Sequence, residues 1–326
     1  MLKHGGRLLS AVNKYSIKKS DWLDLSTGIN PCGWPVPEMP ANVFQRLPET
    51  NDGLELAAAE YYQNTSLLPI AGSQAAIQLL PELRDKSRVL LPRLGYREHE
   101  YHWRQQGHDI RLYKTADLKK ELQDTDVLVV INPNNPTGEC IGTEQLLEWH
   151  QQLVSKGGWL IVDEAFMDAR CENSLVSYGG CKGLIILRSV GKFFGLAGIR
   201  SGFVFAEDRL LSQMEEALGT WSVSSVARYI TKLALSDKRW QEQTKIRLRS
   251  ESEKLQVCLQ ASFRQQPEGC DLFQTLMLPQ ASDVYKQLAQ QGVLVRLLDN
   301  EQGLRFGLPL PSQWPKLEQV LSGMSC

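Results

Sequence analysis

The feature that most constrains this chain's fold is an alternation of short apolar runs with polar, helix-compatible segments between about residues 65 and 206. Each apolar run can form one buried strand, and each polar segment can form a helical crossover to the next strand. The alternation predicts an α/β fold with a mostly parallel, seven-stranded sheet covered on both faces. The expected strands are 67–71, 88–91, 110–113, 127–131, 159–162, 184–187 and 203–206.

Beyond residue 206 the alternation of short apolar runs and helical segments gives way to longer helical patterns and shorter strands, which predicts a second and smaller α/β domain. Helical patterns rich in Arg, Glu, Gln and Leu cover about 209–218 and 223–260. Shorter strands are expected at 272–278, 293–297 and 303–307, with a helix between the first two.

The length of 326 residues favours two domains over a single core. The first 35 or so residues include a cluster of prolines and glycines, and we expect them to form an extended arm. We predict an N-terminal arm at 1–40 that contributes to the small domain and the active site. A large domain at 41–218 and a small domain at 219–326 complete the predicted organisation.

Composition excludes several classes of function. The chain has 36 basic and 37 acidic residues, so it lacks the basic excess of a nucleic-acid-binding protein. Its apolar runs are strand-sized, and its first 20 residues lack the apolar core of a secretory signal, so no membrane association is expected. Seven cysteines without a C-x-x-C pair argue against a disulfide framework and a metal site. We therefore expect a metal-free cytoplasmic protein.

Polar residues follow several of the predicted strands, where ligands of parallel sheets bind. Ser73 and Gln74 follow the first strand in a turn that could offer backbone N–H groups to an anion, although an ordinary Ser helix cap is the favoured explanation of this turn alone. The segment 132–138 (Asn-Pro-Asn-Asn-Pro-Thr-Gly) is a stiff turn whose amides can face a ligand. Asp163 ends a buried strand, so its carboxylate needs a partner such as a core arginine or a protonated ring nitrogen.

The segment 189–200 is the most informative of these strand ends. It places Ser189, Lys192 and Arg200 on a glycine-rich loop between two predicted strands. A partly desolvated lysine can become a nucleophile toward a carbonyl compound, while a hydroxyl and a guanidinium suit a phosphate monoester. Together they favour pyridoxal 5'-phosphate (PLP), although solvated charges on a surface loop are the alternative for this segment alone. The joint appearance of such groups at four strand ends predicts one site.

These motifs resemble the PLP-dependent enzymes of the aspartate aminotransferase fold type (fold type I). The matching patterns are N-P-x-N-P-T-G at 132–138, D-E-A-[FY] at 163–166, S-x-x-K at 189–192 and the arginine at 200. The resemblance extends over almost the whole chain. It implies the PLP-dependent transferase fold and a homodimer with active sites at the subunit interface.

The resemblance also implies roles for individual residues. Lys192 would bond to the cofactor and move protons at the substrate's α-carbon, and Asp163 would keep the pyridine nitrogen protonated. Asn135 would bind the phenolic oxygen of the cofactor, and Tyr96 would stack on its ring unless it is a core aromatic. The cofactor phosphate would be held by Ser73, Gln74, Ser189 and Arg200.

Substrate-binding residues are implied in the two terminal parts of the chain. Arg305 would take the substrate carboxylate, unless it is a surface arginine at a strand edge. The pattern H-G-G…D-[LF]-S-x-x-I-N-P is similar to the branch of this family that decarboxylates threonine phosphate for cobalamin biosynthesis. This similarity implies that His4 contacts the substrate phosphate and that Asn30 lies beside the carboxylate. The candidate substrate-binding set is His4, Gly5, Gly28, Asn30 and Arg305.

Two departures bear on the choice of reaction. Phe166 and Leu47 stand where histidinol-phosphate aminotransferases usually carry tyrosines that reach the cofactor. Neither change removes a group that is essential to PLP chemistry. We therefore expect a PLP-dependent decarboxylase of a phosphorylated amino acid, L-threonine O-3-phosphate. An aminotransferase resembling histidinol-phosphate aminotransferase and a catalytically silent PLP-fold binding protein stay open as alternatives.

Overall fold

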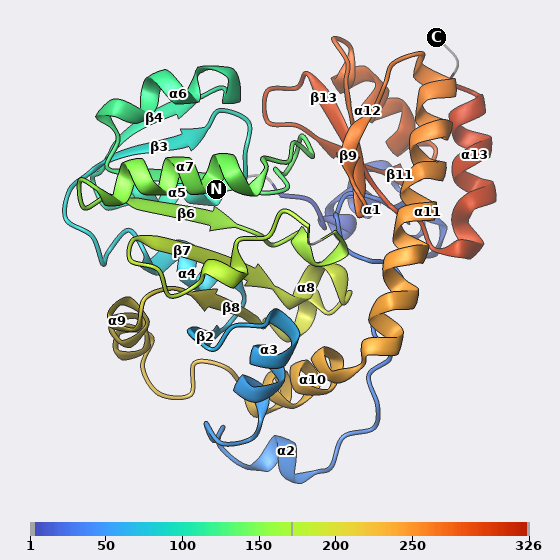
Figure 1. The fold of residues 1–326 in the computed structure, drawn as a ribbon. Helices are drawn as coiled ribbons and strands as arrows, with labels where there is room; N and C mark the ends of the chain where they lie inside the picture. The colour runs from blue at the N-terminus through green and yellow to red at the C-terminus, as the bar shows by residue number, and fades with distance from the viewer. Residues whose placement is uncertain (1–3, 171, 325–326) are drawn as a thin grey trace. The chain divides into compact units, whose positions relative to one another are not determined.

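The computed structural model describes residues 4–170 and 172–324. The chain divides into two compact units (Figure 1). The sheet unit consists of Trp34–Asn135 and Cys140–Glu242, and the C-terminal unit of Met1–Gly33, Pro136–Glu139 and Gln243–Cys326. None of the helices within the described residues combines the length and apolarity needed to cross a membrane.

A seven-stranded sheet forms the centre of the sheet unit, with the order β2-β8-β7-β6-β5-β3-β4 (Figure 1). β8 runs antiparallel to both of its neighbours, and the other adjacent pairs are parallel. The predicted α/β class with a mostly parallel sheet is therefore confirmed. The strands are β2 (Leu67–Ile70), β3 (Arg88–Pro92), β4 (Asp109–Tyr113), β5 (Val127–Ile131), β6 (Trp159–Asp163), β7 (Leu184–Ser189) and β8 (Gly202–Phe205).

Successive strand residues point to opposite faces of the sheet, and apolar residues lie on both faces, so helices cover both. On one face, Val129, Ile161 and Ile185 belong to a core with residues of α4, α5 and α9. On the other face, Phe203 and Phe205 lie edge-on to Tyr62 of α3. The helices of this unit are α2 (Asn42–Gln45), α3 (Leu54–Tyr62), α4 (Ser73–Leu79), α5 (Arg97–Gln105), α6 (Leu118–Glu121), α7 (Thr143–Val154), α8 (Val190–Phe193), α9 (Asp208–Leu218) and α10 (Ser225–Ser236).

The single helical stretch predicted for 223–260 is wrong, because the chain breaks at Asp237 into α10 and α11 (Lys238–Phe263). The Asp237 carboxylate accepts a bond from the backbone N–H of Trp240 at 3.0 Å, which caps the start of α11. The Gln241 side chain donates to two carbonyls at the end of α10. Both new helix ends are thus satisfied within the break.

The C-terminal unit holds a four-stranded antiparallel sheet with the order β12-β13-β10-β9. The predicted strand at 293–297 is two short strands with different partners, since β11 pairs with β1 and β12 pairs with β13. The strands are β1 (Leu23–Asp24), β9 (Glu268–Cys270), β10 (Phe273–Met277), β11 (Val293–Leu294), β12 (Arg296–Leu297) and β13 (Gly303–Gly307). The helices are α1 (Leu8–Tyr15), α12 (Ala281–Gln290), α13 (Trp314–Ser322) and the later part of α11.

The N-terminal arm is not simply extended, which corrects that expectation. Its α1 is amphipathic, and Ala11 packs in one core with Trp22 and with Ala289 of α12. The sheet unit also reaches beyond residue 218, because α10 packs against α3. The functional domain bounds at 1–40, 41–218 and 219–326 stay a prediction.

Candidate active site

The carboxyl ends of the parallel strands lie at one edge of the sheet, and the direction of β8 brings Arg200 to that edge as well. β8 is antiparallel to β7, and Ser189 at the end of β7 faces Gly202 at the start of β8. Gly72 has a φ of 75°, and a Cβ there would lie 2.9 Å from Nη2 of Arg200. The residue before α4 therefore lies close to the Arg200 guanidinium, and its positive φ favours glycine.

Side-chain hydrogen bonds connect α4 to Tyr96. The Tyr96 hydroxyl donates to Oε1 of Gln74 at 3.0 Å, and Nε2 of Gln74 donates to Glu98 at 3.1 Å. The Gln74 side chain thus fixes the position of the Tyr96 ring, and its backbone N–H is the group that could face an anion.

Asp163 is buried and has two hydrogen-bond partners. Its Oδ1 accepts a bond from the Ala165 N–H at 3.0 Å, and its Oδ2 lies 2.9 Å from Nε2 of His99. Both Asp163 and His99 are nearly inaccessible to solvent. The imidazole therefore orients the carboxylate at the end of β6.

In the turn after β5, the side chains of two of the three asparagines form hydrogen bonds to the backbone of neighbouring segments. Asn132 exchanges two bonds with Ile141, at 3.0 and 2.8 Å. Asn134 donates to the Leu94 carbonyl at 2.9 Å. These bonds fix the turn on which the half-buried Asn135 stands.

Lys192 lies on α8, a single turn of helix between β7 and β8. Its Nζ is 5.4 Å from the centroid of the Phe166 ring. The next residues anchor the turn, since Phe193 packs edge-on to Trp240 and Phe194 stacks on it at 5.6 Å. The lysine thus stands on a rigid turn with an aromatic face beside its amine.

Within the C-terminal unit, Ser26 joins the predicted Gly5 to the predicted Arg305. The Ser26 carbonyl accepts a bond from Nη2 of Arg305 at 2.9 Å, and its hydroxyl accepts one from the Gly6 N–H at 2.8 Å. A Cβ on Gly5 would lie only 2.0 Å from the Ser26 carbonyl oxygen. The His4 segment therefore lies against the backbone that holds Arg305.

The other predicted residues of this unit, Gly28 and Asn30, follow β1 in the sequence. The side-chain oxygen of Asn30 accepts bonds from Nη2 of Arg247 at 2.8 Å and from the Cys32 N–H at 3.0 Å. These two bonds fix the orientation of the Asn30 amide group. Gly28 is buried in the same segment.

Two residues of this geometry were missed by the sequence reasoning. His99 stands three positions after Tyr96 on one face of a helix, a spacing that could have identified it.

Arg296 is directly opposite Arg305 in the β12–β13 register, so both side chains are on one face of the sheet. Burial, and then the Arg296 cation, lower the pKa of Arg305. Two facing arginines are costly unless anions offset their charges, and Oδ1 of Asp299 lies 3.6 Å from Nη2 of Arg296.

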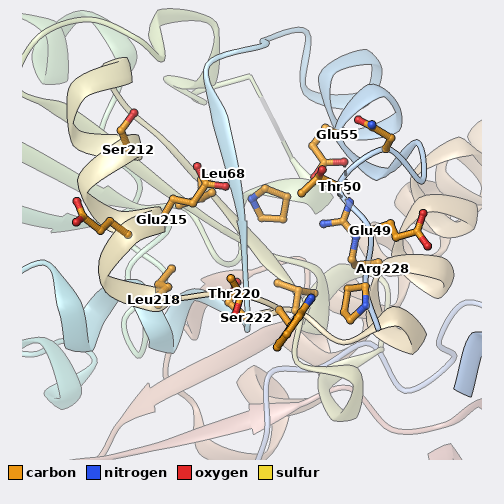
Figure 2. Close-up of a pocket in the computed structure, with 17 residues that line it drawn as sticks. Glu49, Thr50, Glu55, Leu68, Ser212, Glu215, Leu218, Thr220, Ser222 and Arg228 are labelled. Carbon is orange, nitrogen blue, oxygen red and sulfur yellow. Dashed lines mark hydrogen bonds and ion pairs between the residues drawn. The ribbon is translucent and has the colours of Figure 1, made fainter. Parts of the chain in front are cut away.

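A cavity of about 830 Å³ opens at the β2 edge of the sheet unit (Figure 2). Glu55 and Arg228 lie on one side of it and Glu215 of α9 on the other. Arg228 is held there by Asp52 and Glu55 at 2.8 Å. None of the predicted site residues is in its lining, so cavity size does not locate the predicted chemistry. Among the described residues, no cluster of His, Cys, Asp or Glu side chains could hold a metal ion.

Residues 43–305 match the aminotransferase class I and II family. The chain belongs to this family. Membership confirms the resemblance that the sequence motifs predicted, and it agrees with an enzyme rather than a binding module. The family match covers all of the predicted cofactor-binding residues.

The chain is also similar to individual curated proteins and solved structures of this family. The chain is 45% identical to a threonine-phosphate decarboxylase from Pseudomonas aeruginosa over 324 residues, which cover 99% of this chain and 98% of the relative. A threonine-phosphate decarboxylase from a Sinorhizobium species is 35% identical, with 91% and 90% covered. The fold is shared with a histidinol-phosphate aminotransferase from Sinorhizobium meliloti solved with PLP, at a TM-score of 0.81, 16% identity and 99% coverage of both chains.

Proposed function

We propose that this chain is a PLP-dependent carboxy-lyase that converts L-threonine O-3-phosphate to (R)-1-aminopropan-2-ol O-2-phosphate in cobalamin biosynthesis. The observation that carries the proposal is the 45% identity to a threonine-phosphate decarboxylase over nearly the whole of both chains. The motif around His4 and the segment ending at Asn30, within the part of the chain that this identity covers, agree with it.

The residues at the sheet edge fit PLP. The Arg200 guanidinium, which lies close to Gly72, would bind the cofactor phosphate together with Ser189 and the N–H groups of Ser73 and Gln74. Asp163 would pair with the protonated pyridine nitrogen, and Lys192 would carry the aldehyde carbon. Tyr96 would cover the ring face, and Asn135 would donate to the phenolic oxygen.

When bound at this site, PLP supplies an electron sink for the bond that breaks at the α-carbon. The protein residues would decide which bond that is by fixing the orientation of the substrate. Arg305 would bind the substrate carboxylate, and His4 would bind its phosphate. Lys192 would then return a proton to the α-carbon after carbon dioxide leaves.

The facing of Arg296 and Arg305 agrees with an anionic substrate. We propose that Arg296 assists Arg305 in binding it, and that Gly5, Gly28 and Asn30 shape the same subsite. Gly5 lies against Ser26, whose carbonyl accepts the bond from Arg305, so it is close to the residue that would bind the carboxylate.

The second candidate is an aminotransferase of a phosphorylated amino acid. Its support is the fold shared with a solved histidinol-phosphate aminotransferase. Phe166 disfavours it, because those enzymes usually carry tyrosine at this position.

A single-turnover reaction of the cofactor-loaded protein separates the two candidates. With L-threonine O-3-phosphate and no keto acid, the lyase releases carbon dioxide and an aminopropanol phosphate. Turnover that requires a keto acid and releases no gas would refute the decarboxylase and support the aminotransferase.

We further propose that the protein is a cytoplasmic homodimer. Phe44, Leu47 and Trp221 of the sheet unit are each about 60% exposed, and such large apolar side chains suit a protein contact. Light scattering at micromolar concentration should report twice the mass of the chain. A fully active monomer would contradict the dimer.

A further inference from the structure

A buried ion cluster lies beside the proposed cofactor site and has no role in the proposed function. Its members are Tyr61, Glu164, Asp168 and Arg188, which come from α3, β7 and the turn that follows β6. Glu164, Asp168 and Arg188 are each no more than 3% exposed. Burying two carboxylates and one guanidinium is costly, so such a cluster is weak evidence for a stabilising role.

Arg188 joins the two carboxylates. Its Nη1 donates to Glu164 at 2.7 Å, and its Nη2 donates to Asp168 at 2.5 Å. The Glu164 carboxylate also accepts bonds from the Ser174 hydroxyl and the Leu175 N–H. The turn from Glu164 to Asp168 is therefore fixed at both of its ends by one guanidinium.

The proposed catalytic groups stand directly beside these fixed points. Asp163 precedes Glu164, and Phe166, whose ring lies beside the Lys192 amine, is in the middle of the turn. Arg188 itself is on the strand that leads into the Lys192 turn.

The cluster also contacts the Lys192 turn through Tyr61. The Tyr61 hydroxyl donates to Asp168 at 3.1 Å, and the Tyr61 ring packs 5.7 Å from that of Phe194. Burial, with Asp168 next, raises the pKa of the Tyr61 phenol, so it stays a donor at any physiological pH. The same aspartate is thus linked to both flanks of the proposed site.

We propose that Arg188 is a positioning residue, which acts through Glu164 and Asp168 to hold the Phe166 turn and the Lys192 turn in one fixed arrangement. Its guanidinium touches neither cofactor nor substrate in this account. The proposal rests on the proposed function in one respect, namely that Lys192 attaches the cofactor.

Arg228 provides a matched control. It is also buried in the sheet unit and also binds two carboxylates, Asp52 and Glu55, but it lines the cavity at the β2 edge. Arg188→Lys and Arg228→Lys each replace a planar fork by a single ammonium, so both should destabilise the protein.

Hydrogen exchange of the cofactor-free proteins tests the positioning directly. Arg188→Lys should exchange at least tenfold faster than the wild type in peptides covering 164–168 and 190–195, and Arg228→Lys should not. In the loaded proteins, only Arg188→Lys should shift the absorption of the bound cofactor. Equal exchange in both variants, or a wild-type spectrum in Arg188→Lys, overturns the inference.

A milder variant guards against misfolding. Tyr61→Phe removes only the hydroxyl that binds Asp168, and it should raise exchange at 190–195 by about threefold. If Arg188→Lys does not fold and Tyr61→Phe exchanges like the wild type, the inference fails. Borohydride reduction of the wild-type holoenzyme tests separately whether the cofactor is attached to Lys192. A cofactor absent from Lys192 would refute the proposed function, and the exchange result would remain valid.

Discussion

The two units carry candidate residues of different kinds. At the sheet edge, residues from five segments are placed by strand direction, and hydrogen bonds among side chains fix their orientation, as between Asp163 and His99. In the C-terminal unit, Arg305 is held by a backbone carbonyl, and a glycine gives the arm room beside it. The first region suits a permanently held cofactor, and the second suits a substrate that must leave.

This comparison predicts that variants of the two regions fail differently. Changes at the sheet edge should alter the bound cofactor's absorption, whereas changes in the C-terminal unit should raise KM and leave the spectrum alone.

The largest effect is expected for Lys192→Ala. Removal of the amine abolishes covalent attachment and the proton transfer, so kcat should fall by about 10³-fold or more. Steady-state assays and borohydride reduction measure both losses. A variant that retains a reducible cofactor would show that the attachment site is elsewhere.

Arg305→Lys should raise KM by roughly 10- to 100-fold, because an ammonium cannot make the paired bonds of a guanidinium to a carboxylate. The cofactor spectrum should stay unchanged. Arg249→Lys is the control, since Arg249 is exposed on α11 in the same unit and pairs with Glu253. An altered spectrum in Arg305→Lys would break the division between the regions.

His99→Leu should lower kcat by about tenfold, because the Asp163 carboxylate loses the partner that orients it. The absorption of the bound cofactor should shift as well. His150→Leu removes a histidine of the same unit that bonds to the Lys182 carbonyl, and it should leave the spectrum unchanged. Identical spectra for both variants would remove His99 from the site.

The smallest effect is expected for Asp126→Asn, at the opposite ends of the strands. The hydrogen bond from Arg88 lowers the pKa of Asp126 to about 2. A lowered pKa stabilises the fold above the unfolded value of about 4, and this contribution is lost as pH falls through about 2. The variant should lower Tm by about 2 °C at pH 6 and by less near pH 3. Cofactor and substrate binding should not change.

The sequence predicted the sheet edge well because strand periodicity and motif spacing are local signals. All seven strands of the sheet unit and the position of Asp163 followed from them. The break at Asp237 was not predictable, because the helical pattern continues through it and the capping bonds of Asp237 and Gln241 exist only in the folded chain.

The C-terminal unit was less predictable for a physical reason. Its residues are assembled from both ends of the chain, and β1 pairs with β11 across most of the sequence. The facing of Arg296 and Arg305 depends on strand register, which no local pattern specifies. The buried contacts of Arg188 were missed for the same reason, since its partners lie on other segments.

The most direct test of the central claim is to locate the cofactor on the wild-type chain. The holoenzyme is reduced with borohydride and digested, and the modified peptide is sequenced by mass spectrometry. We predict a pyridoxyl phosphate group on Lys192 alone. The same group on another lysine, or an unmodified chain after loading with PLP, would contradict it.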